Sequence, residues 1–360
     1  MGPPPGWPTI VDPLVAWKGS EFRSDDLYTY ILDNDEIAEI EVALAHFKGL
    51  GLDGRDVVRD NFPLPTLAAK LDALAEDLHD GRGFFAVRGL NPTKYSREDN
   101  IVIFLGVSSY VGELRGKQDD KGHIFAHIKE AKYMQEGQQE RPIRDSNASS
   151  AFHTDLFADI LAMQTRSCAL TGGNHMVSSV ATVYRELLAT RPDLISVLAA
   201  PNWPFDTRGI LTPPSVRPLL FHHDSRLLMS LVPDPLVGIP SIPRTKGLPS
   251  LSTLQIEALE VVEGIARRHC RVLCMQPGDL TFVNNLGVLH AREGFVDQPG
   301  RSERYLVRLW LRNAELGWEL PEVLATGGER VFGEVEGVEE DWNVAFKPRL
   351  AFLPAERLSP

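Results

Sequence analysis

Three residues that lie far apart in the sequence limit what this chain can fold into. The segment Phe152-His153-Thr154-Asp155 offers an imidazole and a carboxylate two positions apart, and His290 follows much later, at the end of Asn284-Asn285-Leu286-Gly287-Val288-Leu289-His290. Side chains at positions i and i+2 of an extended segment point to the same side. His153 and Asp155 can therefore converge on one point, to which a distant strand can bring His290. Such a meeting suits a closed or sandwich-like β core with inserted helices.

The chemistry of these three side chains indicates a metal site. Two imidazoles and one carboxylate on one face of a metal ion leave its other positions open, which is typical of non-haem Fe(II) oxygenases. A His-x-Asp triplet is weak evidence alone, but three arginines follow His290, namely Arg292, Arg304 and Arg308. Cationic side chains on a strand after the last ligand can bind the carboxylates of a dicarboxylate such as 2-oxoglutarate. The combination predicts an iron oxygenase that uses 2-oxoglutarate and O2.

Composition narrows the class of protein. The 360 residues carry a formal net charge of −12, which argues against a nucleic acid or an anionic membrane as the main partner. No apolar run approaches the roughly 20 residues of a membrane span. Three cysteines do not form a disulfide framework, and the N-terminus lacks the features of a signal peptide. We therefore expect a cytoplasmic protein that acts on a small molecule, with homo-oligomerisation left open.

Periodicity and capping residues predict most of the regular elements. Helices are expected over 35–47, 64–78, 96–109, 178–189 and 253–268, where apolar residues recur at helical spacing or a Ser precedes the run. Strands are expected over 83–89, 161–165, 167–170, 271–275, 279–283 and 304–311, with a hairpin over 219–231. The segment 316–360, rich in Glu, Gly and Pro, is expected to be irregular. A glycine-rich strand-to-helix turn is missing, which disfavours a dinucleotide-binding fold.

Several stretches together resemble one family. They are Gly81-Arg82-Gly83-Phe84-Phe85, His153-Thr154-Asp155, Thr171-Gly172-Gly173-Asn174, Gly278-Asp279-Leu280, Asn284-Asn285 to His290-Ala291-Arg292, and Arg304-Tyr305-Leu306-Val307-Arg308. This pattern resembles the taurine-dioxygenase-like Fe(II)/2-oxoglutarate oxygenases, especially their fungal branch. The resemblance implies a mainly β protein with inserted helices and a double-stranded β-helix (jelly-roll) core over 81–315. Residues 1–80 would be a helical leader packed on the core, and residues 316–360 a C-terminal extension that can act as an active-site lid.

The resemblance also implies roles for individual residues. His153, Asp155 and His290 would hold the iron, and Arg304 would bind the distal carboxylate of 2-oxoglutarate, because a guanidinium binds a carboxylate through two parallel hydrogen bonds. Arg308 matches a position that holds the anionic group of the substrate in the taurine enzyme.

One position departs from the family pattern, and one more is a candidate for the cosubstrate. The family usually has Thr or Ser two residues after the Gly-Gly pair, where this chain has His175. An imidazole N–H can replace the hydroxyl as the donor to 2-oxoglutarate. Arg292 is a further candidate for the cosubstrate, with a structural role as its alternative.

The substrate is less constrained by the sequence. Trp342, Val344 and Phe346 form an apolar patch in the polar tail, so they either contact the substrate or pin the C-terminus to the core. The resemblance to the fungal branch of the family implies a small anionic substrate, an amino acid or organic acid of fungal secondary metabolism. It would be oxidised at an unactivated C–H by hydroxylation, desaturation or ring closure, for example aziridine formation from valine. The alternatives are a 2-oxoglutarate-independent iron oxygenase and a non-catalytic jelly-roll binding protein.

Overall fold

The structure is a computed structural model that describes residues 2–119, 121–132, 137–138, 141–207, 216–239, 243–334 and 338–346. The helices within these residues are α1 (Asn34–Gly49), α2 (Ala68–Asp80), α3 (Arg97–Ser108), α4 (Val180–Thr190), α5 (Pro192–Leu198), α6 (Pro233–Val237), α7 (Thr253–His269) and α8 (Glu322–Phe332). The strands are β1 (Thr29–Ile31), β2 (Phe84–Arg88), β3 (Leu114–Gly116), β4 (Phe125–Lys129), β5 (Ile160–Ser167), β6 (Thr171–Gly172), β7 (His175–Ser179), β8 (Trp203–Pro204), β9 (Val216–Arg217), β10 (Leu220–His223), β11 (Arg226–Met229), β12 (Arg271–Leu273), β13 (Leu280–Asn284), β14 (Val288–Arg292), β15 (Phe295–Val296) and β16 (Tyr305–Arg312).

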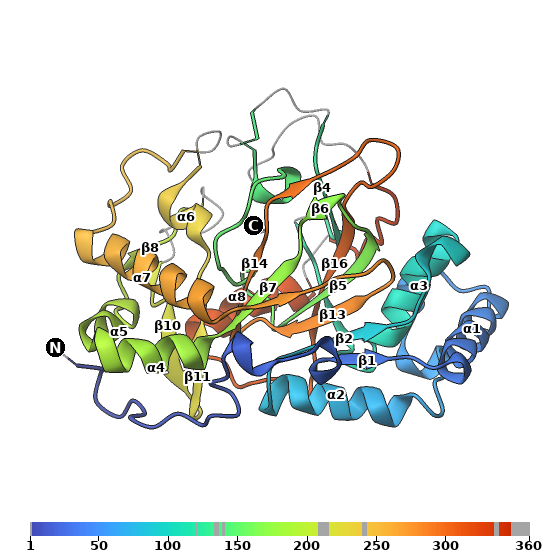
Figure 1. Cartoon of the computed structure of the whole chain (residues 1–360), viewed down its shortest axis with the longest axis horizontal. Helices are drawn as coiled ribbons and strands as arrows, with labels where there is room; N and C mark the ends of the chain where they lie inside the picture. Colours follow the sequence, from blue (N-terminus) through green and yellow to red (C-terminus); the bar gives the residue numbers. More distant parts are fainter. Residues whose placement is uncertain are drawn as a thin grey trace.

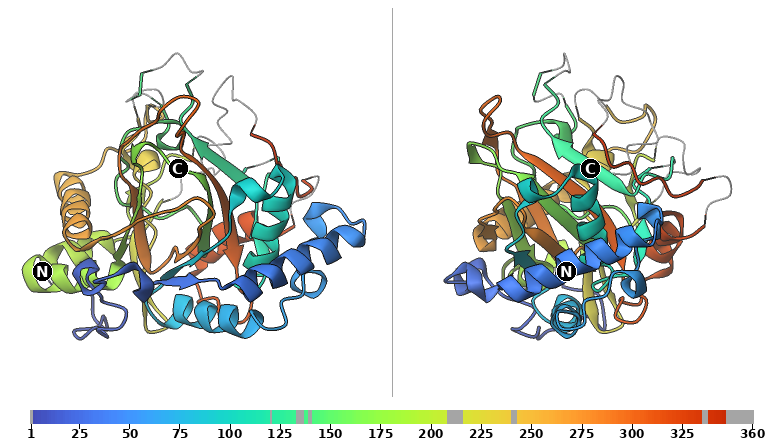
Figure 2. Two further views of the ribbon diagram at one scale, coloured as in Figure 1. Left: turned by 45° about the vertical axis from the view of Figure 1, so that its right-hand side comes forward. Right: turned by 90° about the vertical axis from the view of Figure 1, so that its right-hand side faces the viewer.

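Two sheets form the centre of the molecule. The larger one has the order β1-β2-β13-β5-β16-β3, with β4 also paired to β16, and it is mixed because β1 runs parallel to β2. The smaller sheet has the order β12-β7-β14 and is antiparallel. The strands surround a common centre, as the left view of Figure 2 shows. The expected β core with inserted helices is confirmed at this level.

The two sheets and the helices form layers because side chains alternate along each strand. On β16, Val307 and Leu309 face a cluster shared with α1 and α3, whereas Leu306 and Trp310 face the other sheet. The outer side of the smaller sheet packs on α4, α5 and α7. Figure 1 accordingly shows α1, α2 and α3 on one side of the strands, and α4, α5 and α7 on the other. The inner faces of both sheets therefore meet at the centre of the molecule.

The helix boundaries follow from caps that the sequence carries. The Asp33 carboxylate accepts from the Glu36 backbone N–H, and the Glu36 side chain accepts from the Asp33 N–H. Ser96 caps α3 in the expected place, and Ser252 caps α7. The expected hairpin is β10–β11, and Asp224 and Ser225 turn the chain with φ angles of 46° and 61°. These predictions are confirmed.

The prediction of an irregular C-terminal segment is wrong for residues 322–332, which form α8. Gly327 and Gly328 lie within this helix, where glycine normally weakens helical structure. A Cβ atom on Gly327 would lie 2.1 Å from the ring of Phe157, so the glycine is required by close packing. Phe157 belongs to the loop that follows the His153-Thr154-Asp155 triplet. Only the packed structure shows why α8 tolerates glycine here.

The described end of the tail runs along β4. The backbone N–H of Ile124 donates to the carbonyl of Asp341 at 3.1 Å, and that of Phe125 donates to Asn343 Oδ1 at 3.2 Å. The Nε2 atom of His127 lies 2.7 Å from the carbonyl oxygen of Asn343. Residues 347–360, the remainder of the expected extension, lie outside the described residues. The segment 341–343 therefore continues the edge of the larger sheet.

A histidine between two carboxylates fixes this segment, and it leads to a prediction on pH. His123 Nδ1 lies 2.6 Å from Asp119 Oδ2, and its Nε2 lies 3.2 Å from Asp341 Oδ2, so only the protonated ring can donate to both. The hydrogen bond to Asp119 raises the pKa of His123 above its ordinary value. Because the folded-state pKa is the higher one, the stabilisation is complete below about pH 6.5 and is lost as pH rises through the folded pKa.

We expect the Tm advantage of the wild type over His123→Gln to fall by roughly 1–2 °C between about pH 6 and about pH 8. Thermal unfolding followed by circular dichroism at stepped pH measures this difference. A Tm difference that does not change with pH would contradict the prediction.

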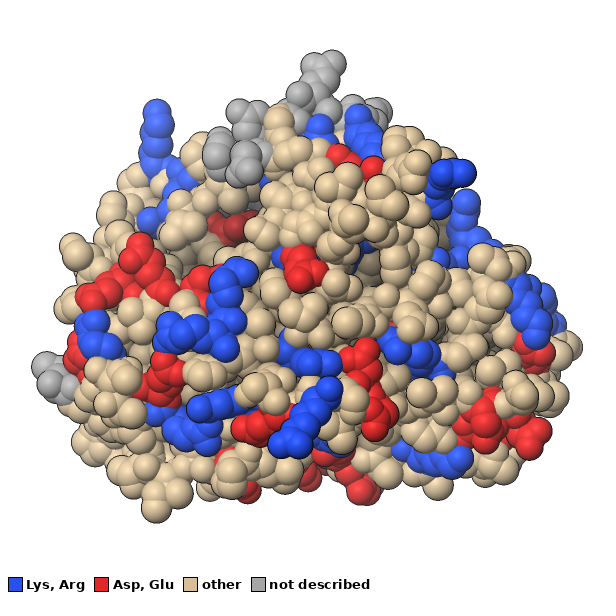
Figure 3. Space-filling model, viewed as in Figure 1, with Lys and Arg blue, Asp and Glu red and all other residues tan. Residues whose placement is uncertain are grey.

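The surface carries charges of both signs on the face drawn in Figure 3. Basic and acidic side chains are interspersed on the face drawn in Figure 3, and no continuous basic surface is present on that face. Among the described residues, none of the helices has the length and apolar character that crossing a membrane requires.

Candidate active site

The backbone brings the two histidines together directly. The N–H of His153 donates to the carbonyl of His290 at 2.9 Å, and the N–H of His290 donates back at the same distance. Thr154 fixes the segment from the other side, because its N–H donates to the Leu231 carbonyl at 2.8 Å and its Oγ1 accepts from the Leu231 N–H at 2.9 Å. The triplet is thus fastened between β14 and the segment that follows β11.

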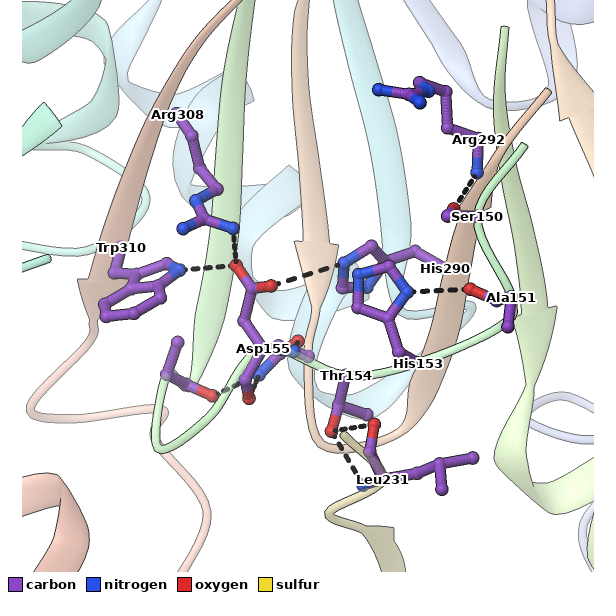
Figure 4. Close-up of polar contacts among 12 residues, drawn as sticks. Ser150, Ala151, His153, Thr154, Asp155, Leu231, His290, Arg292, Arg308 and Trp310 are labelled. Carbon is purple, nitrogen blue, oxygen red and sulfur yellow. Dashed lines mark hydrogen bonds and ion pairs between the residues drawn. The ribbon is translucent and has the colours of Figure 1, made fainter. Parts of the chain in front are cut away.

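The three side chains meet as the spacing predicts. One ligand atom each from His153, Asp155 and His290 lies within 4.8 Å of the others. The two imidazole centroids are 4.3 Å apart. Figure 4 shows the Asp155 carboxylate between the histidines on one side and Arg308 and Trp310 on the other.

The hydrogen bonds of His153 and Asp155 leave one atom of each side chain for a metal. His153 Nδ1 lies 2.8 Å from the carbonyl oxygen of Ala151, which leaves Nε2 as the ligand atom. Asp155 Oδ2 accepts from Trp310 Nε1 at 2.6 Å and from Arg308 Nη1 at 2.9 Å. Its other oxygen, Oδ1, is buried without a hydrogen bond and lies 3.6 Å from His290 Nε2. A divalent ion between these atoms would satisfy Oδ1, so the residues fit Fe(II).

The charge states suit metal binding as well. Burial, and then the neighbouring His290, lowers the pKa of His153 to about 3, so its ring is neutral and offers a lone pair. Burial opposes the charge of Asp155, but Arg308 and His290 hold the pKa of this carboxyl well below its usual range. A neutral imidazole and an ionised carboxylate are the forms that metal ligation needs.

Asn285 and Trp310, for which the sequence predicts no role, hold Asp155 in place. Asn285 accepts from the Asp155 N–H at 2.7 Å and donates to the carbonyls of Asp155 and Ala158 at 2.8 and 2.6 Å. Trp310 holds Oδ2, as described above. Trp310 follows Arg308 by two residues on the same strand, so the sequence already indicated that both side chains point to one face. The sequence did not indicate the hydrogen bonds of Asn285.

Removing the indole N–H tests the positioning role of Trp310. We expect Trp310→Phe to weaken Fe(II) binding by about 10- to 100-fold, the range seen when a partner of a metal ligand is lost. The smaller ring and the lost hydrogen bond should also lower Tm, so circular dichroism first verifies that the variant is folded at the temperature of the titration. Anaerobic Fe(II) titration measures the affinity, and the visible band of the Fe(II)–2-oxoglutarate complex should shift. An unaltered affinity and band would assign Trp310 to packing alone.

The cosubstrate candidates lie on the inner face beside His290. His175 pairs with Arg292 across β7 and β14, and its ring centroid lies 5.6 Å from that of His290. Both ring nitrogens of His175 are buried without a hydrogen bond. Burial, then His290 and Arg304, hold the pKa of His175 well below its usual value. A neutral, buried imidazole with open nitrogens is suited to a polar ligand next to the metal.

Arg304 is a buried cation without a carboxylate partner among the described residues. Its Nε donates to the Gly173 carbonyl at 2.8 Å, while Nη1 is buried without a partner. Burial lowers the pKa of Arg304 to about 9, because nothing in this part of the structure offsets the charge fully. A Cβ atom on Gly173 would lie 2.7 Å from Arg304 Cδ, so this glycine makes room for the arginine. The arrangement fits an incoming carboxylate.

Arg292 and Arg308 are more strongly engaged. Arg292 Nη2 donates to the carbonyls of Ser146 and Ala148, which ties it to the loop before the triplet and supports the structural alternative. The guanidinium of Arg308 lies next to Asp155, with Nη1 2.9 Å from Asp155 Oδ2. Its Nε and Nη2 donate to Gln118 Oε1 at 3.2 and 3.0 Å. Its contact with Asp155 was not foreseen.

The structure places the three tail residues away from the metal ligands. Trp342 and Val344 pack against the cluster of α1 and α3, and the Trp342 ring occupies the space beside Gly54. Phe346 contacts the His127 ring at 6.2 Å between centroids, on the face of β4 and β16 opposite to Arg308. These contacts support the pinning of the C-terminus to the core and not contact with substrate at the metal.

Comparisons with known proteins agree with this site. The model of the "Taurine catabolism dioxygenase TauD, TfdA family" matches residues 47–310. The chain is 33% identical over 326 residues to the "Taurine hydroxylase-like protein SAT17" of Stachybotrys chartarum, across 88% of this chain and 84% of that protein. It is 25% identical over 320 residues to "FR-33289 synthase" of Streptomyces rubellomurinus, across 86% and 92%.

Solved structures share the fold. An asparagine oxygenase in complex with Fe(II), 2S,3S-3-hydroxyasparagine and succinate aligns with a TM-score of 0.62 at 15% identity, over 81% of this chain and 98% of that one. The non-haem iron oxygenase OrfP in complex with Fe and alpha-ketoglutaric acid aligns with a TM-score of 0.58 at 18% identity, over 79% and 94%. At these identities the likeness concerns the fold.

The family match decides between the alternatives that the sequence left open. It spans most of the chain, including both histidines and Asp155, and the three side chains meet with an open carboxylate oxygen. The match to this dioxygenase family argues against the two alternatives, a non-catalytic binding protein and an oxygenase that does not use 2-oxoglutarate. The chain belongs to the taurine catabolism dioxygenase TauD, TfdA family and is an oxidoreductase, a dioxygenase that depends on Fe(II), 2-oxoglutarate and O2.

Proposed function

We propose that this dioxygenase has a jelly-roll core and oxidises an unactivated C–H bond of a small anionic substrate, an amino acid or organic acid of fungal secondary metabolism. The outcome would be hydroxylation, desaturation or ring closure, such as aziridine formation from valine. The names of its two relatives, a taurine hydroxylase-like protein and a synthase, are compatible with small-molecule chemistry. The single observation that carries the proposal is the buried cation Arg308, whose guanidinium lies 2.9 Å from the carboxylate of the iron ligand Asp155.

In this proposal His153, Asp155 and His290 hold Fe(II) at one face. Arg304 binds the distal carboxylate of 2-oxoglutarate through Nη1, and His175 donates a hydrogen bond to the same cosubstrate. When bound, iron and 2-oxoglutarate supply O2 activation with release of succinate and CO2. The protein positions the C–H bond, and the buried inner faces of the sheets exclude water.

Arg308 has two tasks in the proposed site. It keeps Asp155 ionised, since the guanidinium lies 2.9 Å from Oδ2. It also provides a positive charge next to the open metal positions, where the anionic group of a substrate would gain from it. The two tasks are separable by experiment, because the first concerns iron affinity and the second concerns substrate affinity.

Succinate release tests the proposed function. Anaerobic titration with Fe(II) and 2-oxoglutarate should first give a weak visible absorption band. Oxygen is then admitted with a panel of amino acids and small organic acids, and succinate is measured. Stimulation by small acids supports the proposal, whereas stimulation only by large neutral molecules would contradict it.

A further inference from the structure

A small pocket opens beside one of the proposed iron ligands. Its volume is 160 Å³, which is below the roughly 300–1,000 Å³ of pockets for drug-sized ligands. Its wall includes one metal-ligand side chain, one acidic side chain, one arginine and part of the loop that precedes the triplet; these residues are His153, Asp234, Arg141, Ser149, Ser150 and Ala151. The pocket therefore has the size of a small metabolite and adjoins the metal site.

Asp234 is the unexplained group in this wall. Its side chain is half-buried, yet among the described residues no donor lies within hydrogen-bond distance of its carboxylate and no cation lies within 4 Å. Burial raises the pKa of Asp234, and no neighbouring cation among these residues counteracts that effect. Asp234 also lies in the first turn of α6, where an acidic side chain is favourable, but its carboxylate lines the pocket and a ligand that donates hydrogen bonds there would gain from it.

The position of Asp234 is fixed relative to the metal ligands. Asp234 follows Leu231 by three residues, and Leu231 is held by two hydrogen bonds to Thr154 of the triplet. The carbonyl of Pro235 accepts from the Asp206 N–H at 2.9 Å, and Leu236 is fully buried. The carboxylate is thus carried on a rigid segment that is tied to the ligand-bearing loop.

We propose that Asp234 binds the ammonium group of the substrate, which makes the substrate an amino acid or another amine-bearing acid. This inference rests on the proposed function and narrows its substrate class. A plain organic acid would bring only negative charge to the Asp234 side of the site. An ammonium group supplies both the missing positive charge and the missing hydrogen-bond donors.

The charges around the site are consistent with a zwitterion. Arg308 lies on the Asp155 side of the ligand cluster, whereas Ser150 and Ala151, which belong to the pocket wall, lie on the side of His153, as Figure 4 shows. An amine-bearing acid could thus direct its anionic group towards Arg308 and its ammonium group towards Asp234. This arrangement would hold the carbon between them in front of the open metal positions.

Paired substrates test the proposal on the intact enzyme loaded with Fe(II) and 2-oxoglutarate. Each amino acid of the panel, L-valine included, is compared with the same acid lacking the amino group. We expect Asp234→Asn to raise KM by roughly 10- to 100-fold for the amine-bearing member only. The KM for 2-oxoglutarate should stay unchanged. Glu260→Gln, on an exposed position of α7, is the matched control and should behave as wild type.

Substrate binding can also be measured without turnover, from the visible band of the anaerobic complex. Under anaerobic conditions, the amine-bearing acid should perturb the visible band of the wild-type complex at a lower concentration than its deaminated partner, and Asp234→Asn should abolish this preference. Equal responses to both partners, with succinate released from both, would overturn the role of Asp234 while leaving the proposed function in place. A complex that forms its band but responds to no small acid would overturn both.

Discussion

The Asp155→Ala variant is expected to lose Fe(II) binding and turnover by more than the 10- to 100-fold that the loss of a mere partner of a metal ligand causes. Asp155 supplies the only carboxylate of the His153–Asp155–His290 group, and its Oδ1 has no other hydrogen-bond partner among the described residues. His153→Ala and His290→Ala should have effects of the same order. Iron stoichiometry after anaerobic loading and succinate release measure the two losses.

A second substitution separates the metal from the fold in this experiment. Asp155→Ala also leaves Arg308 buried next to a missing partner, which can itself destabilise the fold by about 3–5 kcal/mol. Asp155→Asn keeps an oxygen for Trp310 and the volume of the side chain, so its Tm should stay closer to that of the wild type. It should still lose most iron binding, because the charge is gone. Wild-type stoichiometry and turnover in Asp155→Ala would show that Asp155 is not a ligand.

The second large effect is expected for Arg304→Ala. Losing a charge-assisted pair in a buried pocket costs roughly 2–5 kcal/mol, which is about 30- to several-thousand-fold in affinity for 2-oxoglutarate. Iron affinity should stay nearly unchanged, because Arg304 has no contact with the three ligands among those described. The dependence of succinate release on 2-oxoglutarate concentration gives the size of the effect.

Nearby substitutions control for general effects on the site. Arg301→Ala removes an exposed arginine three residues earlier and should leave the requirement for 2-oxoglutarate as it is. Gly173→Ala should act in the same direction as Arg304→Ala, because the added Cβ would displace the arginine side chain. If Arg304→Ala left the requirement unchanged, the carboxylate would have to be bound by Arg292 or Arg308 instead.

The elements that the sequence predicted well are those whose signals are local. The caps at Ser96 and Ser252 act within one helical turn, so the starts of α3 and α7 could be placed without knowledge of the fold. The triplet of His153 and Asp155 is likewise local, since an extended backbone alone puts both side chains on one side.

Other features depend on contacts between distant segments. Strand alternation groups Arg308 and Trp310 on one face of β16, but it does not say that Asp155 will be their neighbour. The Glu-, Gly- and Pro-rich composition of residues 316–360 predicts an irregular segment, whereas Gly327 lies in α8 and packs against Phe157, which is far away in the sequence.

The sequence by itself determined the chemistry of this protein: which side chains can hold a metal, which cations can bind a dicarboxylate, and that a β core must join them. Only the tertiary structure decided where the tail lies, on the outer face of β4, and that Asp234 enters the wall of the pocket beside His153. The physical reason is that spacing along a strand or helix fixes the direction of a side chain relative to its neighbours. What that side chain meets is set by the packing of segments far apart in the chain.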